Sequence, residues 1–321
     1  MFYLAVHPEV HMKTRWLSGG QVAVVVAVIT GTTLAAGCGS SNTDASVDDG
    51  YVHYDVAPIT VGPGQSGMWI QWIASPFDHD QNIIDVIAAQ QQAGHHAVLY
   101  STSNVQPVGT TREMLNSDQY DIQFLGGVGG EGGRPIRLPP DVFFRLPAGR
   151  ALVVQTHYMN TTSATVEGRT TVAVKFGQPS PNDKLASFFV STSANVKVAP
   201  LVDSQQDVSC TLPKDLQFLM LANHMHAMGT TIQTTVSQAG AAATMLKDNP
   251  RWDPELTYNP DYTFATVQNP VTLGAGSTLA THCAWHNTSD KMLELPDEMC
   301  LFLGFFLGEK DVKCIDGSWL E

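Results

Sequence analysis

Short apolar runs alternate along this chain with turn-forming residues. The clearest runs are rich in β-branched and aromatic side chains and are bounded by Gly, Pro, Asn and Asp, a spacing typical of sandwiches and barrels. These runs span residues 67–74, 150–158, 230–236 and 262–267. No long amphipathic helical pattern stands out, and residues 85–92 fit one helical turn as well as a strand followed by a loop. The pattern therefore predicts an all-β fold.

A Pro-rich polar stretch at residues 177–183 suggests a boundary within this fold. We expect two tandem antiparallel β-sandwich domains of jelly-roll-like form, over residues 51–178 and 184–321, both of ordinary domain size. The glycine-rich segment 126–133 lacks the Gly-Lys-Ser/Thr ending of a phosphate-binding loop and opens no helical pattern. We expect it to be an ordinary loop.

The N-terminus has the pattern of a targeting segment. Lys13 and Arg15 precede the apolar run 22–29, and small residues lead to Cys38, which together predict a secretory signal over residues 1–38. Translation starts at Met1 or Met12, because the first residues add nothing to this pattern. The apolar run is too short to span a membrane as a helix.

The residues before Cys38 resemble a bacterial lipobox, although Ala35 stands where Leu is commonest. If this interpretation is right, Cys38 is lipidated and residues 39–50 form a flexible tether. The chain is then exported to the periplasm or the outer face of a bacterial membrane and contacts the membrane only through its lipid anchor. The alternative is an ordinary secretory signal with an incidental cysteine.

Charge and cysteine content narrow the function classes. The net charge of −13 makes a protein that follows nucleic-acid phosphates or anionic lipid surfaces improbable. Four cysteines remain after Cys38, namely Cys210, Cys283, Cys300 and Cys314. An even set in an oxidising compartment usually forms disulfides, and four cysteines allow three pairings.

Histidines supply the candidate chemistry. His224 and His226 would share one face of a strand, where both imidazoles could bind one ion. His95 and His96 are adjacent, so both could reach one ion only at a turn or bulge, which Gly94 permits. Taken singly, the first pair is as consistent with core packing and the second with two surface residues.

His157 belongs to another apolar strand and shares a face with Gln155. Taken alone, such a histidine is more often a hydrogen-bonded structural residue than a metal ligand.

Five segments in order resemble the copper type II, ascorbate-dependent monooxygenases, which include peptidylglycine α-hydroxylating monooxygenase and dopamine β-monooxygenase. Similarity runs from about residue 54 to about residue 306. The matching segments are GHHAVLY at 94–100, VVQTHY at 153–158, HMHAMG at 224–229, CAWHNT at 283–288 and DEMC at 297–300.

The resemblance implies two copper ions per chain. It assigns an electron-donating copper in the N-terminal sandwich and an oxygen-activating copper in the C-terminal one. The implied ligands are His95, His96 and His157 for the first, with Gln155 in support, and His224, His226 and Met299 for the second. Imidazole suits both oxidation states of copper, and a thioether favours Cu(I).

The same resemblance implies the disulfides Cys283–Cys300 and Cys210–Cys314, the first of which would hold Met299 in place. It also implies hydroxylation of a C–H bond with dioxygen and a reductant such as ascorbate. Peptide-hydroxylating members carry an arginine and a tyrosine where this chain has Ala222 and Leu303. We therefore expect a neutral or apolar small-molecule substrate.

Two other function classes stay open. The chain could be a non-catalytic exported copper-binding or electron-relay lipoprotein, or a plain sandwich lipoprotein whose histidines are relics. His282 and His286 lie outside the implied ligand set, and we expect them to be surface or packing residues.

Overall fold

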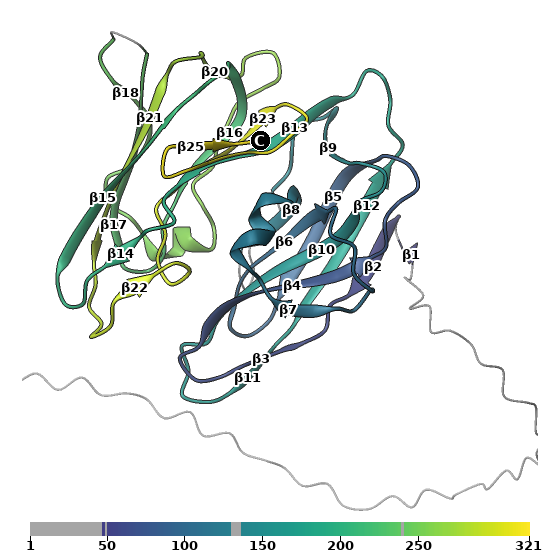
Figure 1. Cartoon of the computed structure of the whole chain (residues 1–321), viewed down its shortest axis with the longest axis horizontal. Helices are drawn as coiled ribbons and strands as arrows, with labels where there is room; N and C mark the ends of the chain where they lie inside the picture. Colours follow the sequence, from purple (N-terminus) through teal and green to yellow (C-terminus); the bar gives the residue numbers. More distant parts are fainter. Residues whose placement is uncertain (1–46, 49, 130–135, 239–240) are drawn as a thin grey trace, which may run out of the picture. The chain divides into compact units, whose positions relative to one another are not determined.

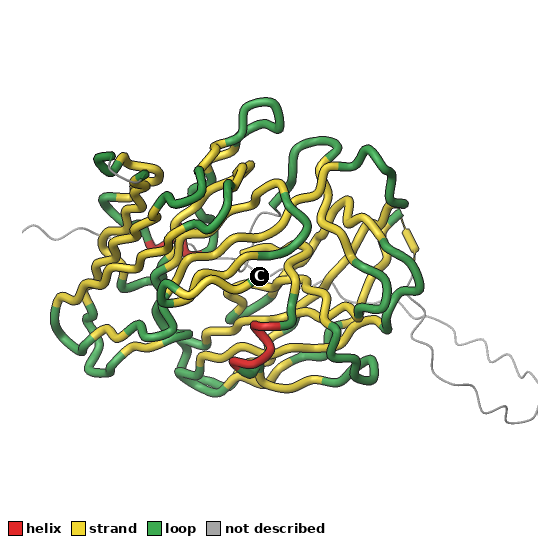
Figure 2. The backbone as a smooth tube through the Cα atoms, turned by 45° about the horizontal axis from the view of Figure 1, so that its top comes forward, coloured by secondary structure: helices red, strands yellow, loops and turns green. Residues whose placement is uncertain are grey.

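The computed structural model describes residues 47–48, 50–129, 136–238 and 241–321. The expected signal segment, Cys38 and residues 39–46 and 49 of the expected tether lie outside this range. Strands make up nearly all of the regular structure, and two short 3-10 helices are the only helical elements among the described residues (Figure 2). The described helices include none long and apolar enough to cross a membrane. The all-β prediction is confirmed.

The N-terminal half contains two sheets that pack face to face (Figure 1). One has the strand order β7-β4-β10-β6-β8, and the other runs β1-β2-β12-β5-β9. Leu99, Leu152 and Val154 of the first sheet pack against Val86 and Val174 of the second. The elements are β1 (Val47–Asp48), β2 (Tyr51–Asp55), β3 (Ile59–Val61), β4 (Ser66–Ala74), β5 (Gln81–Gln90), β6 (Gly94–Thr102), β7 (Thr111–Glu113), η1 (Asn116–Tyr120), β8 (Gln123–Gly129), β9 (Val142–Leu146), β10 (Ala151–Met159), β11 (Val166–Gly168) and β12 (Thr170–Gly177).

The C-terminal half repeats this plan. A sheet with the order β15-β21-β17-β18 packs on the sheet formed by β13, β23 and β16, through a core that includes Phe189, Phe218, Leu279 and Phe302. The elements are β13 (Lys184–Thr192), β14 (Lys197–Val198), β15 (Asp203–Thr211), β16 (Leu216–His224), β17 (Gly229–Ser237), β18 (Thr244–Asn249), η2 (Pro254–Thr257), β19 (Thr263–Phe264), β20 (Val271–Leu273), β21 (Thr278–His286), β22 (Leu293–Glu294), β23 (Leu301–Leu307), β24 (Val312–Ile315) and β25 (Ser318–Leu320).

One sheet continues from the first half into the second. Strand β9 pairs in parallel with β13, which joins the outer N-terminal sheet to β13, β23 and β16. Strand β24 also runs parallel to β13. These two pairings are parallel exceptions within sheets whose other pairings are antiparallel. The polar stretch at residues 177–183 lies between β12 and β13.

Two local expectations are decided by packing. Residues 85–90 belong to β5, so the strand alternative for that segment is correct. The loop expected at residues 126–133 is wrong for residues 126–129, which complete strand β8. Glycine is needed there because a Cβ on Gly126 would lie 2.6 Å from Cγ2 of Val86. The glycines let β8 approach β5 closely, and residues 130–133 lie outside the described residues.

Both disulfides implied by the family resemblance are formed, Cys210–Cys314 and Cys283–Cys300. The first joins β15 to β24, and the second joins β21 to the residue just before β23. Cys300 directly follows Met299, so the second bridge fixes the backbone on which the thioether is carried.

A partly buried pair of charged residues, Asp311 and Lys313, also connects the two halves. The carboxylate of Asp311, in the turn between β23 and β24, accepts hydrogen bonds from the backbone N–H of Phe124 at 2.5 Å and of Phe188 at 2.8 Å. Lys313 donates to the carbonyl oxygens of Gln119 and Ile122. Burial raises the pKa of Asp311 to about 6, although both N–H donors lower it.

This raised pKa predicts a pH dependence of stability. The carboxyl group of Asp311 has a higher pKa in the folded protein than in the unfolded chain. Its contribution to the free energy of unfolding is therefore fully present below about pH 4 and is lost as the pH rises through about 6. The Asp311→Asn variant lacks this pH-dependent contribution, because an amide does not titrate in this range. The wild type should therefore lose up to about 3 kcal/mol relative to the variant between pH 4 and 7.

Urea unfolding of both proteins across this range measures the difference. A free-energy difference that stays constant with pH would contradict the assignment.

Candidate metal centre

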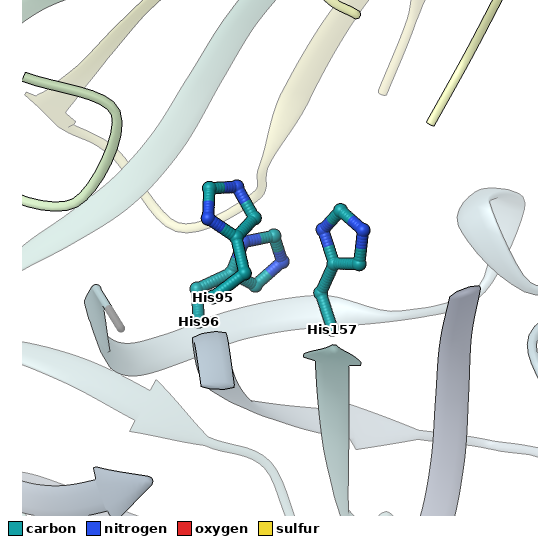
Figure 3. A group of neighbouring side chains, drawn as sticks. All are labelled: His95, His96 and His157. Carbon is teal, nitrogen blue, oxygen red and sulfur yellow. The ribbon is translucent and has the colours of Figure 1, made fainter. Parts of the chain in front are cut away.

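A β-bulge brings His95 and His96 to the same side of the N-terminal sheet. In the pairing of β10 with β6, His157 lies opposite His96 and Tyr158 lies opposite Gly94, so His95 is the extra residue. The imidazole centroid of His95 lies 5.0 Å from that of His96 and 4.7 Å from that of His157. Figure 3 shows the three rings projecting into one space from β6 and β10. The bulge that Gly94 was expected to permit is present.

Glycine is required at position 94 by close packing. A Cβ there would lie 2.4 Å from Cβ of Gln90 and 2.9 Å from the carbonyl oxygen of Gln91. The turn before the bulge is closed by a hydrogen bond from the backbone N–H of Gly94 to this same oxygen.

His224 and His226 approach each other in a different way from the one expected. Strand β16 ends at His224, so His226 lies just beyond it and does not share its alternation. The two rings are nevertheless 5.2 Å apart between centroids. Nδ1 of His226 donates to the carbonyl oxygen of Asp297 at 2.9 Å, and its backbone N–H donates to Glu298. The segment before β23 therefore fixes His226.

The two histidine groups form one cluster. Nε2 of His95 lies 3.0 Å from Nε2 of His226, in the other half of the chain. Ring nitrogens within 4.8 Å of one another define two possible ligand sets, and His95 belongs to both. One set is His95, His96 and His157, and the other is His95, His224 and His226.

Burial keeps all five rings neutral. Loss of solvent, followed by repulsion from neighbouring imidazoles, lowers the pKa values of His95, His157 and His224 well below the usual range for histidine. Desolvation also lowers the pKa values of His96 and His226, both to about 4. Neutral imidazole is the form that binds metals.

The hydrogen bonds of His226 fix which ring nitrogens carry lone pairs. Because Nδ1 of His226 donates to Asp297, its Nε2 carries a lone pair, which His95 satisfies from its own Nε2–H. The remaining lone pair of His95 is then on Nδ1. That nitrogen and Nδ1 of His157 are buried with no hydrogen-bond partner among the described residues. Buried polar atoms are rarely left in this state unless a ligand or water meets them.

Met299 and Gln155 also lie at the centre. Met299 is 8% exposed and lines the same cavity as His96 and His224. The side chain of Gln155 hydrogen-bonds to His96, and its Nε2 lies 2.9 Å from the sulfur of Met68.

Several residues at this centre were not identified from the sequence. Glu298 is buried and accepts hydrogen bonds from the backbone N–H groups of His226 and Met228 and from the indole of Trp285. Burial raises its pKa to about 7, against the effect of these donors. Its position in the DEMC segment, next to Met299, was the available signal. Tyr258 packs edge-on against His95, with a centroid distance of 5.3 Å, and gave no signal.

His282 and His286 lie away from the cluster on the exposed side of β21. They pair with Asp207 and Asp203 at 2.8 and 2.6 Å, respectively. The expectation that they are surface residues is confirmed.

Comparison with known proteins supports one family. Residues 191–315 match the family model described as copper type II ascorbate-dependent monooxygenase, C-terminal domain. The match covers less than half of the chain and confirms the resemblance over that segment. It contains His224, His226 and Met299, whereas the segment with His95, His96 and His157 lies outside it.

The other comparisons add little. No curated protein matches the chain. Among solved structures, a recombinant peptide:N-glycanase F shares 10% identity with a TM-score of 0.33, over 82% of this chain and 97% of its own. The major capsid protein P2 of bacteriophage PM2 shares 8% identity with a TM-score of 0.29, over 80% of this chain and 97% of its own. These scores are too low to support an argument about fold or function.

The bulge gives a first test of the centre. Gly94→Ala should lower the free energy of unfolding by about 1–3 kcal/mol, because the new methyl group overlaps Gln90 and the bulge must rearrange. Copper affinity should fall as well, since His95 and His96 lose their common direction.

Urea unfolding and copper titration measure the two effects, with Gly274→Ala as the matched control. A Cβ at Gly274 would lie at an ordinary van der Waals distance of 3.8 Å from its nearest neighbour, Oδ1 of Asp215. Equal copper affinity in Gly94→Ala and the wild type would exclude a role for the bulge.

Proposed function

We propose that this chain, whose residues 191–315 carry a C-terminal domain of the copper type II ascorbate-dependent monooxygenase family, is a copper-dependent monooxygenase. It would hydroxylate a C–H bond of a neutral or apolar small molecule, with dioxygen and a reductant such as ascorbate. The observation that carries this proposal is the cluster of five neutral imidazoles from both halves of the chain, which opens on a cavity also lined by the thioether of Met299.

The donor set fits copper. Imidazole and thioether ligands suit copper in its reduced and oxidised states, whereas magnesium and calcium prefer oxygen donors. The Nδ1 atoms of His95 and His157 have no hydrogen-bond partner among the described residues, so each could donate a lone pair to a metal ion. All four cysteines of the described chain are joined in disulfides, so a thiolate ligand is excluded among the described residues.

The residues of the chain divide into two roles. His95, His96 and His157 would hold the ion that donates an electron, and His224, His226 and Met299 would hold the ion at which dioxygen reacts. Bound copper would supply one-electron transfer and oxygen activation, for which a site with few protein ligands leaves open positions.

The surrounding residues would hold these ligands in position. Asp297 and Glu298 orient His226 through its ring and its backbone, as the hydrogen bonds at each show. The Cys283–Cys300 bridge holds the segment that carries Met299. Leu303 lines the cavity, and Ala222 is buried next to it across β16 and β23. Neither side chain could pair with a substrate carboxylate, which supports a neutral or apolar substrate.

Copper content and oxygen uptake test this function together. The purified protein should take up about two copper ions per chain without an intense blue absorption, because every cysteine among the described residues is in a disulfide. With ascorbate, a panel of neutral substrates should include one that stimulates oxygen uptake and yields an alcohol. Copper binding without substrate-stimulated uptake would instead favour the electron-relay alternative.

Substitution of Met299 provides the control for catalysis. Met299→Leu is close to isosteric and should fold normally, since volume-conserving core changes cost little. It should keep Cu(II) at His224 and His226, lose Cu(I) affinity there and lose most turnover. Full turnover would remove Met299 from the ligand set.

A further inference from the structure

The cavity at the cluster is an elongated slot between facing sheets. It has a volume of about 400 Å³, within the usual range for sites that bind small molecules. His96, His224 and Met299 all line it. Its walls come from strands β6 and β8 of the N-terminal half and from β13 and β23 of the C-terminal half.

Alternate residues of two strands set the length of this slot. Along β6 the lining residues are His96, Val98 and Tyr100, and along β23 they are Leu301, Leu303 and Phe305. The first and last residues of each row are four steps apart along the strand, and at about 3.3 Å per step each row is about 13 Å long. Leu301 pairs with His224, which places the first residue of both rows at the histidine cluster.

Aromatic side chains close the other end. Phe305 pairs with Phe188 across β23 and β13, and Tyr100 pairs with Phe124 across β6 and β8. The ring of Phe124 stacks on Phe188 with centroids 4.9 Å apart and lies 5.2 Å from Phe305. We call Tyr100, Phe124, Phe188 and Phe305 the aromatic floor. Between the floor and the histidines, Val98, Val190 and Leu303 line the slot with aliphatic groups.

The charged lining groups are already engaged by the protein. Apart from the histidines, Asp311 and Lys313 are the only acidic or basic residues among the described ones that line the slot. Asp311 accepts two backbone N–H groups, and Lys313 donates to two carbonyl oxygens. Asp311 and Lys313 also attract each other electrostatically, so their opposite charges offset. A ligand carboxylate or ammonium group would therefore enter the slot without a counter-ion of its own, which is unfavourable in an apolar site.

We propose that the slot binds an uncharged molecule made of an aromatic or other flat apolar ring and a short chain, with the ring on the aromatic floor. The chain then lies between Val98 and Leu303 and points toward His96, His224 and Met299. The position of oxidation rests on the proposed function and would be in the chain rather than on the ring. Binding itself depends only on the slot.

Competition among three matched compounds tests the charge requirement on copper-free protein. The probe is N-phenyl-1-naphthylamine, a neutral dye that fluoresces in apolar sites. The competitors are 4-phenylbutan-1-ol, 4-phenylbutylamine and 4-phenylbutyrate, which share one apolar body. The alcohol should displace the dye at a concentration about tenfold or more below either charged compound. Equal displacement by the amine or the carboxylate would overturn the proposal.

A substituted slot tests the location. In Leu303→Arg, an uncompensated cation enters the middle of the slot, so 4-phenylbutyrate should become the best competitor. Met245→Arg carries the same added charge on β18, at a side chain that is 49% exposed and does not line the slot, and should keep the preference for the alcohol. A folded Leu303→Arg variant that still prefers the alcohol would also overturn the proposal. If this variant does not fold, the competition on the wild-type protein decides the proposal by itself.

Orientation is measured on copper-loaded protein. Paramagnetic Cu(II) should broaden the proton resonances of the alkyl chain of 4-phenylbutan-1-ol more than those of its ring. Stronger broadening of the ring would refute the orientation.

Failure of the two proposals can be told apart. Selective binding of the alcohol without copper-dependent oxygen uptake would refute the monooxygenase function alone. Oxygen uptake with no preference for uncharged ligands would refute the slot proposal alone.

Discussion

The contact between His95 and His226 is the interaction on which the rest of the site depends. These residues come from different sandwiches, and their ring nitrogens lie 3.0 Å apart in a buried position. Two protonated imidazoles could not occupy such positions, so the contact requires at least one neutral ring, and burial lowers the pKa values of both. It also makes the two possible ligand sets one cluster, because His95 belongs to both. The position of one half relative to the other therefore also determines which histidines can share a metal ion.

The fold meets this constraint from both sides. On the N-terminal side, a bulge that only glycine at position 94 accommodates turns His95 and His96 in one direction. On the C-terminal side, the carboxylate of Glu298 gathers backbone N–H groups around His226, next to the disulfide at Cys300. At the far end of the slot, Asp311 joins the two halves through the backbone of both. The cavity lies between these two connections.

The sequence was sufficient for the features that depend on local pattern or on family resemblance. Apolar runs bounded by turn-forming residues predicted the strands, Gly94 permitted a turn or bulge at the adjacent histidines, and the resemblance implied both disulfides. Features that depend on contacts between distant segments could not be predicted. The positions of the strands along the sequence do not indicate how close His95 and His226 come in the folded chain. The glycines of β8 resemble a loop in the sequence, because the close approach of Val86 that requires glycine at position 126 has no local signal. The parallel pairing of β9 with β13 also has no local signature.

The most direct test of one shared cluster is the copper content of a His95→Ala variant compared with His157→Ala. We would measure bound copper by titration and its environment by electron paramagnetic resonance. Because His95 would bind the first ion and also contacts His226 of the second ligand group, His95→Ala should weaken every copper site in the protein, whereas His157→Ala should weaken one and leave the signal of the other unchanged. If His95→Ala depletes a single site and the other keeps its wild-type affinity and signal, the two groups of histidines are independent and the account is wrong.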